Sequence, residues 1–221
     1  MLSESAPAPD PATTPVAVPA PSPWNVANAL TVTRILLVPV YGWLLLYDGG
    51  EHVGMRWWAA VVLVVATLTD RVDGDIARRR GLITNFGKIA DPIADKTLMG
   101  MAFVGLSVLG DLPWWVTVVV LVREWGVTVL RFFVIRHGVM PAGRGGKVKT
   151  ALQFFGLLLF TLPLSSFAGA DTWTRVADVV LGLAVVVTVA TGLDIAVKAL
   201  RLRQTSERSA MKRARRAARQ G

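Results

Sequence analysis

The chain contains no cysteine and few charged residues, and both absences narrow its chemistry. Without cysteine there are no disulfide bonds and no thiol catalysis. Charged residues make up only 18% of the 221 residues, whereas hydrophobic residues make up 53%, a balance that is too apolar for an ordinary soluble domain. One membrane domain is the simplest account of a chain of this length and composition.

The first 23 residues differ in composition from the rest of the chain. They are rich in Pro, Ala, Ser and Thr and carry almost no large apolar side chains, so we predict that they are disordered. They have no basic start and no apolar core before Pro21, so they do not resemble a secretory signal. We therefore divide the chain into a disordered leader (1–23), a membrane domain (24–200) and a basic tail (201–221).

Six apolar stretches follow the leader, each near the ~20 residues that a bilayer core requires. They predict an all-α integral membrane protein with six transmembrane helices. The predicted spans are 29–47, 56–79, 88–109, 113–136, 149–168 and 174–198.

Positive charge alternates between the connections and predicts the orientation of these spans. The second and fourth connections are basic, and the tail from Lys198 holds nine basic residues against one acid, Glu207. By the positive-inside rule, both termini are cytoplasmic, and five tryptophans fall at predicted outer ends as interfacial anchors: Trp57, Trp58, Trp114, Trp115 and Trp173. Basic groups that flank apolar spans indicate contact with lipid headgroups rather than with nucleic acid. The tail fits either an amphipathic helix on anionic lipid or a disordered charged segment.

The stretch from Asp70 to Asp95 carries five carboxylates between two apolar runs. Asp70 and Asp73 are three residues apart, and Asp91 and Asp95 are four apart, so each pair projects from one face of its own helix. Two such helices side by side would bring four carboxylates together. Their repulsion would be relieved by hard divalent cations such as Mg²⁺ or Mn²⁺. Asp75 points elsewhere, about 140° around the helix from Asp70.

These acids belong to a longer pattern of fixed residues. The run Asp70-x-x-Asp73-Gly74-x-x-Ala77-Arg78, then eight residues, then Gly87-x-x-x-Asp91-x-x-x-Asp95, resembles the complete signature of the CDP-alcohol phosphatidyltransferases. The resemblance implies a membrane enzyme that displaces CMP from a CDP-linked lipid with the help of two divalent ions, Mg²⁺ or Mn²⁺. The alternative is that the acids only form salt bridges with neighbouring arginines.

The resemblance also implies roles for individual residues. Asp95 would take the proton of the acceptor hydroxyl, and the two metal ions would be held by Asp70, Asp73, Asp91 and Asp95. The CDP moiety would be bound by Asn28, Thr31, Gly74, Ala77, Arg78 and Gly87. Small residues let a ring or a ribose lie against the backbone, and an arginine offers phosphate a planar fork of donors. Asn28, Thr31 and Arg34 share one helix face, which could also be only an interfacial polar face.

Two further features bear on the acceptor. Arg123 and Glu124 are a charged pair inside an apolar helix and should face the protein interior. The glycine-rich run 143–150 delivers lysines to a helix start, a reasonable anion site. Together they resemble family members that use sn-glycerol 3-phosphate, so we predict that the acceptor phosphate is bound by Arg123, Arg144, Lys147 and Lys149. The lysines could instead be ordinary positive-inside residues.

The expected reaction transfers the phosphatidyl group of CDP-diacylglycerol to sn-glycerol 3-phosphate, at the cytoplasmic side of a bacterial plasma membrane. We expect direct displacement, because the chain has no cysteine and its two histidines, His52 and His137, lie outside the signature. The rival acceptors are inositol phosphate, and phosphatidylglycerol, which would give cardiolipin. A divalent-cation or proton transporter is the rival from another class, but no internal repeat supports it. The resemblance further implies a homodimer, although no span carries a clear stripe of small residues.

Overall fold

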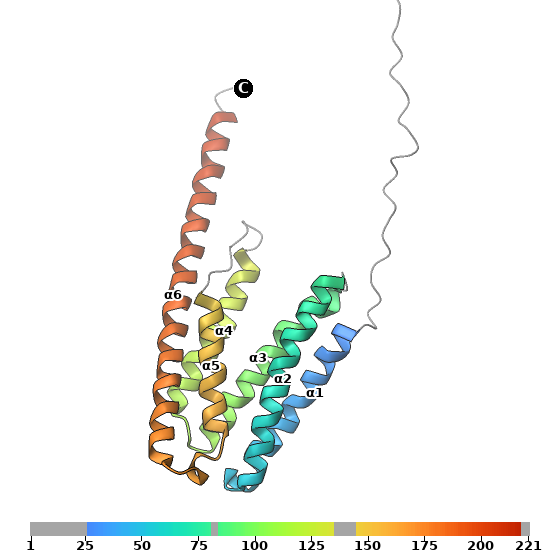
Figure 1. The fold of residues 1–221 in the computed structure, drawn as a ribbon. Helices are drawn as coiled ribbons and strands as arrows, with labels where there is room; N and C mark the ends of the chain where they lie inside the picture. The colour runs from blue at the N-terminus through green and yellow to red at the C-terminus, as the bar shows by residue number, and fades with distance from the viewer. Residues whose placement is uncertain (1–25, 81–83, 135–144, 218–221) are drawn as a thin grey trace, which may run out of the picture.

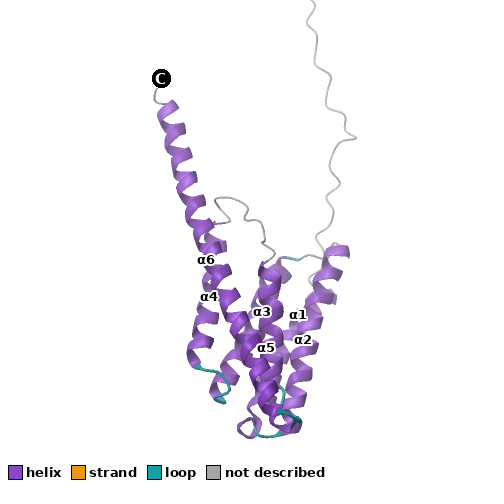
Figure 2. Cartoon of the chain, turned by 60° about the vertical axis from the view of Figure 1, so that its left-hand side comes forward, coloured by secondary structure: helices purple, strands orange, loops and turns teal. Residues whose placement is uncertain are grey.

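A computed structural model of the chain describes residues 26–80, 84–134 and 145–217, and every regular element in these ranges is helical (Figures 1 and 2). No strand occurs in the described ranges, which confirms the predicted all-α class. The predicted disordered leader lies outside the described residues.

Six α-helices and two short 3₁₀ helices make up the described chain. The α-helices are α1 (Val26–Leu46), α2 (Val53–Arg80), α3 (Asn85–Val108), α4 (Trp114–Val134), α5 (Gly145–Thr161) and α6 (Ala170–Ala217). The 3₁₀ helices are η2 (Tyr47–Gly50), between α1 and α2, and η4 (Leu164–Ser166), between α5 and α6. Each α-helix corresponds to one predicted span.

Two helix ends differ from the prediction. The fifth predicted span reached residue 168, but α5 ends at Thr161, because Pro163 has no N–H with which to continue the helix. The backbone of the tail continues α6 as far as Ala217, in agreement with a helical rather than a disordered tail.

Three segments are long and apolar enough to cross a membrane by composition: Asn28–Gly50, Val53–Asp70 and Ala170–Lys198. Within the described residues, the other three predicted spans do not reach this standard. Helices α3 and α4 contain charged residues of the predicted site, and α5 has only 17 residues. Helix α2 reaches the standard although its last turns carry further residues of that site.

The helices pack in two groups that meet along α3. Helix α1 packs against α2 and α3, whereas α6 packs against α5 and α4. Contacts of α3 with α4 and α5, and of α2 with α5, join the two groups (Figure 1). The N-terminal end of α1 and the C-terminal end of α6 lie at the same end of the bundle.

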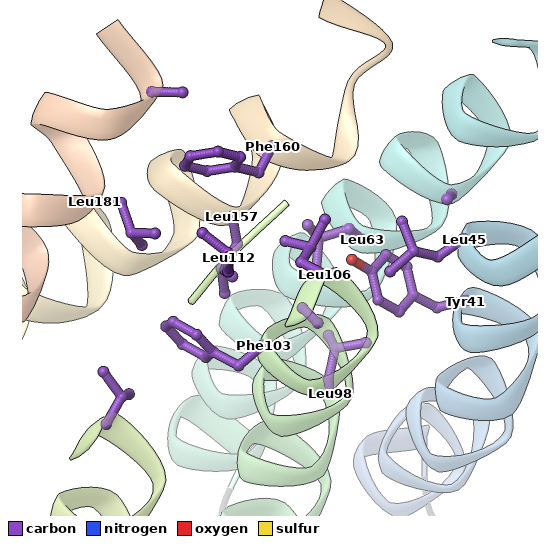
Figure 3. Close-up of a cluster of buried hydrophobic side chains, with 14 of the residues drawn as sticks. Tyr41, Leu45, Leu63, Leu98, Phe103, Leu106, Leu112, Leu157, Phe160 and Leu181 are labelled. Atoms are coloured by element: carbon purple, nitrogen blue, oxygen red, sulfur yellow. The ribbon is translucent and has the colours of Figure 1, made fainter. Parts of the chain in front are cut away.

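A buried apolar cluster fills the space between the two groups (Figure 3). Its large members come from five helices and from the α3–α4 connection; those labelled are Tyr41, Leu45, Leu63, Leu98, Phe103, Leu106, Leu112, Leu157, Phe160 and Leu181. The Tyr41 hydroxyl lies 3.0 Å from the Thr161 hydroxyl, a buried hydrogen bond between α1 and α5. The Arg56 guanidinium forms an ion pair with Asp111 and donates to the Phe160 carbonyl at 3.3 Å. These polar contacts fasten the bundle at the end opposite the acids.

The outer surface of the bundle is apolar. Large side chains such as Leu36, Val122 and Val186 are exposed, as expected of helices that face lipid. The five predicted anchor tryptophans are also exposed and lie in the first turns of α2, α4 and α6. They therefore gather near the connections at the end opposite the acids, as the orientation predicted.

Candidate active site

Polar and charged side chains gather at one end of the helix bundle. Asn28 lies in the first turn of α1, and Asp70 lies in the last three turns of α2, which ends at Arg80. Asp91 and Asp95 lie in the first three turns of α3, which starts at the same end. Side chains from α1, α2 and α3 therefore meet at this end of the bundle.

Two buried residues of α1 contact the predicted metal ligands directly. The Arg34 Nη1 atom lies 2.6 Å from Oδ1 of Asp70. The Thr31 hydroxyl donates to Oδ1 of Asp91 at 2.5 Å. Because Asn28, Thr31 and Arg34 are all buried, the alternative of an interfacial polar face is wrong. This face of α1 instead orients the carboxylates of α2 and α3.

Thr84 joins the start of α3 to α1, a role that the sequence interpretation missed. It is the N-cap of α3, and its hydroxyl oxygen accepts from the Gly87 N–H at 3.0 Å. The same hydroxyl donates to Oδ1 of Asn28 at 3.0 Å. A threonine just before a helical pattern is a known N-cap signal and could have identified Thr84.

Gly87 is required by close packing rather than by an unusual backbone conformation. A Cβ atom at this position would lie 3.0 Å from Oδ1 of Asn28 and 3.4 Å from the Thr84 hydroxyl oxygen. Gly87 and Asn28, both predicted to bind CDP, are thus in contact with one another. The other predicted CDP residues, Gly74, Ala77 and Arg78, lie on the last turns of α2, where only the backbone is described.

A second charged cluster is built from α4, α5 and α6. One oxygen of the Glu124 carboxylate, Oε1, lies 2.6 Å from Lys149 Nζ and 3.0 Å from Arg123 Nη1. The Arg123 guanidinium also donates to the Thr191 hydroxyl of α6 at 2.7 Å. The side chains of Arg123 and Glu124 are only 12% and 19% exposed, so this charged pair faces the protein interior as predicted. Lys149, at 9% exposed, is buried with it.

The predicted acceptor residues do not all come together. Arg123 and Lys149 share the Glu124 carboxylate, whereas Lys147 is exposed although it lies in the same first turns of α5. Residues two apart in a helix point about 200° apart, which explains the difference between the two lysines. Arg144 lies outside the described residues.

Helix α6 supplies partners that were not predicted. The Gln153 amide of α5 donates to the Thr188 hydroxyl at 2.9 Å, within the bundle. Gly192 lies directly against Arg123, because an added Cβ would be 2.9 Å from Cγ of that arginine. Asp194 of the same helix pairs with Lys198 one turn later at 2.6 Å and is exposed.

Asp95 lies between the acidic and the basic clusters. The charges of Asp70, Arg34, Lys149 and Glu124 all act on its carboxyl. A small cavity of about 30 Å³ is lined by Asp95 together with Lys96, Glu124, Lys149 and Gln153, and deeper down by apolar residues. A metal-ligand candidate and the buried Lys149 therefore line the same cavity, and Arg123 is joined to it through its ion pair with Glu124.

Comparison of the sequence with models of known protein families assigns this arrangement to a family. The family model of the CDP-alcohol phosphatidyltransferases matches residues 24–191, which include both clusters. The chain belongs to this family.

Three bacterial relatives, 32% to 50% identical to this chain, carry the names of phospholipid-synthesising enzymes. A protein of Mycobacterium tuberculosis named probable phosphatidylglycerophosphate synthase is 50% identical over 82% of this chain and 87% of its own length. A Bacillus subtilis protein named CDP-diacylglycerol–glycerol-3-phosphate 3-phosphatidyltransferase is 38% identical over 67% of this chain and 84% of its own length. A Streptomyces coelicolor protein named cardiolipin synthase (CMP-forming) is 32% identical over 72% of this chain and 73% of its own length.

The described side chains fit a site for hard divalent cations. Asp70 is 38% exposed and Asp91 is partly exposed, so both carboxylates are accessible. A carboxylate offers about four lone-pair sites on its two oxygens, so one contact to Oδ1 from Arg34 or Thr31 is compatible with a metal ion on the same group. Three of the four predicted ligands, Asp70, Asp91 and Asp95, are among the described side chains, but no three acidic or histidine side chains in that set are grouped closely enough for a metal ion. The side chain of the fourth, Asp73, is outside that set.

Proposed function

We propose that the chain transfers the phosphatidyl group of CDP-diacylglycerol to sn-glycerol 3-phosphate and releases CMP. The observation that carries this proposal is the position of Asp95, between carboxylates suited to a metal-bound pyrophosphate and two buried cations suited to an anionic acceptor. The names of the M. tuberculosis and B. subtilis relatives support the same donor and acceptor.

The acidic cluster would serve the donor. Asp70, Asp73, Asp91 and Asp95 would hold two divalent ions, Mg²⁺ or Mn²⁺, and hard carboxylate oxygens suit both metals. When bound, such ions neutralise the pyrophosphate and stabilise the attacking and leaving oxygens. Gly74, Ala77 and Arg78 would bind the nucleotide. Asn28 and Gly87 would shape this pocket as a pair, since each is packed against the other.

The acceptor would approach from the basic cluster. Arg123 and Lys149 would bind its phosphate, because buried cations bind a phosphate dianion more strongly than solvated ones. Asp95, which lines the adjoining cavity, would take the proton of the primary hydroxyl. The hydroxyl oxygen would then form a bond to the phosphatidyl phosphorus, and the bond from that phosphorus to the CMP oxygen would break. The exposed Lys147 in the first turn of α5 would attract the acceptor rather than hold it. Arg144 would add positive charge to the same segment of the chain.

The orientation of the chain would place this chemistry in the cytoplasm. The C-terminal ends of α2, α4 and α6 and the N-terminal ends of α1, α3 and α5 share one end of the bundle (Figure 1). By the positive-inside rule, that end would face the cytoplasm of a bacterial cell. Homodimerisation remains an expectation from the family.

Cardiolipin synthesis is the second candidate, favoured by the S. coelicolor relative. Its acceptor, phosphatidylglycerol, carries a phosphodiester with one negative charge, whereas glycerol 3-phosphate carries a phosphate monoester with nearly two. Two buried cations that share one carboxylate leave a net charge of about +1 in the acceptor cluster, which favours the more highly charged acceptor.

The test is CMP release by the purified protein in detergent with CDP-diacylglycerol and Mg²⁺. Separate reactions would contain glycerol 3-phosphate, inositol phosphate, phosphatidylglycerol or no acceptor. We expect release with glycerol 3-phosphate and its loss on addition of EDTA. Release with phosphatidylglycerol alone would establish the second candidate, and release with inositol phosphate alone would overturn the acceptor assignment. Folded protein that releases no CMP with any acceptor would overturn the proposed function.

A further inference from the structure

Arg34 is a buried cation beside two of the predicted metal ligands, Asp70 and Asp95, and neither the signature nor the proposed reaction gives it a role. It lies two turns into α1 and is 1% exposed. Its Nη1 atom contacts Asp70 at 2.6 Å, and its charge also acts on Asp95. An arginine withdrawn from water in this way is strongly desolvated, so its charge must be balanced by carboxylates.

The two carboxylates that α1 orients, Asp70 and Asp91, receive donors of different charge. Asp70 receives a charged donor from Arg34, whereas Asp91 receives a neutral donor from Thr31 one turn earlier. Both donors orient a predicted ligand, but only Arg34 adds positive charge to the place where divalent cations would bind. A charge this close to a metal site is only partly screened, because Arg34 itself is buried away from water although Asp70 is not.

We propose that Arg34 is the resident counter-cation of the acidic cluster, a positioning residue that pairs with Asp70 and weakens the binding of divalent cations there. This inference rests on the metal site of the proposed function. Arg34 neutralises one carboxylate in the metal-free protein, which relieves repulsion among the acids of α2 and α3. An incoming cation must then share Asp70 with a guanidinium. Metal binding is weaker as a result, and the ions exchange more readily.

This role and a purely structural role predict opposite signs. If Arg34 only maintained the shape of the cluster, its loss would disorder the ligands and weaken metal binding. If Arg34 is a counter-cation, its loss raises the negative charge at the site and tightens metal binding. Thr31 supplies the matched comparison, because it orients Asp91 without carrying charge.

The experiment measures Mn²⁺ binding without substrate, from the electron paramagnetic resonance signal of free Mn²⁺, at pH 8 in detergent. The proteins are the unaltered chain, Arg34→Gln, Arg34→Lys, Thr31→Val and Arg175→Gln, an exposed arginine at the far end of α6. We expect Arg34→Gln to lower the Kd for Mn²⁺ by about tenfold or more, since a charge near the ligands is removed. Arg34→Lys keeps the charge and should stay near the unaltered value. Thr31→Val should raise the Kd, and Arg175→Gln should leave it unchanged.

Equal or weaker Mn²⁺ binding by folded Arg34→Gln would overturn the inference while leaving the proposed function intact. If Arg34→Gln does not yield monodisperse protein, the Kd of Arg34→Lys for Mn²⁺ decides between the two roles. A Kd near the unaltered value supports a role of the charge, whereas a Kd raised about tenfold or more shows that the fork geometry alone matters and overturns the inference. Absence of saturable Mn²⁺ binding by the unaltered chain would overturn the metal assignment itself, and this inference with it.

Discussion

Asp95 is the residue on which the two clusters converge, so its substitution is the sharpest test at the scale of single side chains. Asp95→Asn keeps the size of the side chain but removes its capacity to accept a proton at neutral pH. We expect CMP release to fall by about 10²-fold or more, the usual contribution of a general base. Binding of CDP-diacylglycerol should largely persist, because three other carboxylates of the predicted metal site remain.

Asp194→Asn is the matched control for that substitution. Asp194 is also a helical aspartate of the described bundle, but it is exposed and paired with Lys198. Exposed ion pairs contribute little to stability, so turnover and folding should both be unchanged. Near-normal turnover in Asp95→Asn, measured beside this control, would remove Asp95 from the mechanism.

The identities of the site residues can be predicted from the sequence more fully than their partners. The spacing of Asp70, Asp91 and Asp95 by itself indicates a cluster, because helical periodicity sets which side chains share a face. The ion pair of Arg34 and Asp70 joins residues 36 apart, and the hydrogen bond of Thr31 and Asp91 joins residues 60 apart. Such contacts depend on how helices pack, and periodicity within one helix carries no information about that.

At the scale of elements, α6 is part of the site although no signature residue lies on it. Its Thr191 hydroxyl accepts from Arg123 at 2.7 Å, and its Gly192 leaves room for the stem of the same arginine. Thr191→Val removes this hydrogen bond with little change in shape. Because hydrogen bonds to charged groups contribute about 1.5 to 3 kcal/mol, we expect the KM for glycerol 3-phosphate to rise about tenfold. The KM for CDP-diacylglycerol should not change.

Thr174→Val, at the other end of α6, controls for the loss of a hydroxyl. Like Thr191, Thr174 donates to the carbonyl four residues earlier in its own helix, but it is exposed. Thr191→Ser should restore acceptor affinity because it keeps the hydroxyl. Equal effects of Thr191→Val on both substrates would indicate general disorder of the bundle rather than a role in positioning Arg123.

Helix positions are largely predictable, and the exceptions have local causes. The predicted span 113–136 corresponds to α4 at Trp114–Val134. The match is close because Pro113 fixes where the helix begins and the long apolar run fixes how far it extends. The predicted fifth span is too long, since the apolar composition continues past Pro163 while the helix does not. The length of α6 could not be predicted, because a basic tail is compatible with helix or disorder until its context is known.

For the whole molecule, the arrangement separates chemistry from anchoring. The ionisable site occupies the end of the bundle where α1 begins and α2 ends. The opposite end holds the tryptophans and the Arg56 ion pair. Between them lies the apolar cluster of Figure 3, tied across the two helix groups by Tyr41 and Thr161, which are 120 residues apart. A rigid apolar middle keeps the acidic and basic clusters at a fixed spacing.

This separation predicts that the tryptophan-rich end is extracytoplasmic, and the absence of cysteine allows a direct test. Single cysteines can be introduced without background: Ser165→Cys in the exposed α5–α6 connection, Ser3→Cys in the leader and Ser209→Cys in the tail. A membrane-impermeant maleimide applied to intact spheroplasts should label Ser165→Cys. It should label the other two variants only after permeabilisation, because both termini are expected on the cytoplasmic side.

The outcome of this labelling bears on both the number of crossings and the location of the chemistry. Labelling of one terminus but not the other on intact cells would require an odd number of crossings and would contradict six spans. Labelling of both termini from outside would invert the orientation and place the acidic cluster away from the cytoplasmic pool of glycerol 3-phosphate. Only protection of both termini, with Ser165→Cys accessible, lets a charged and membrane-impermeant acceptor reach Arg123 and Lys149 directly.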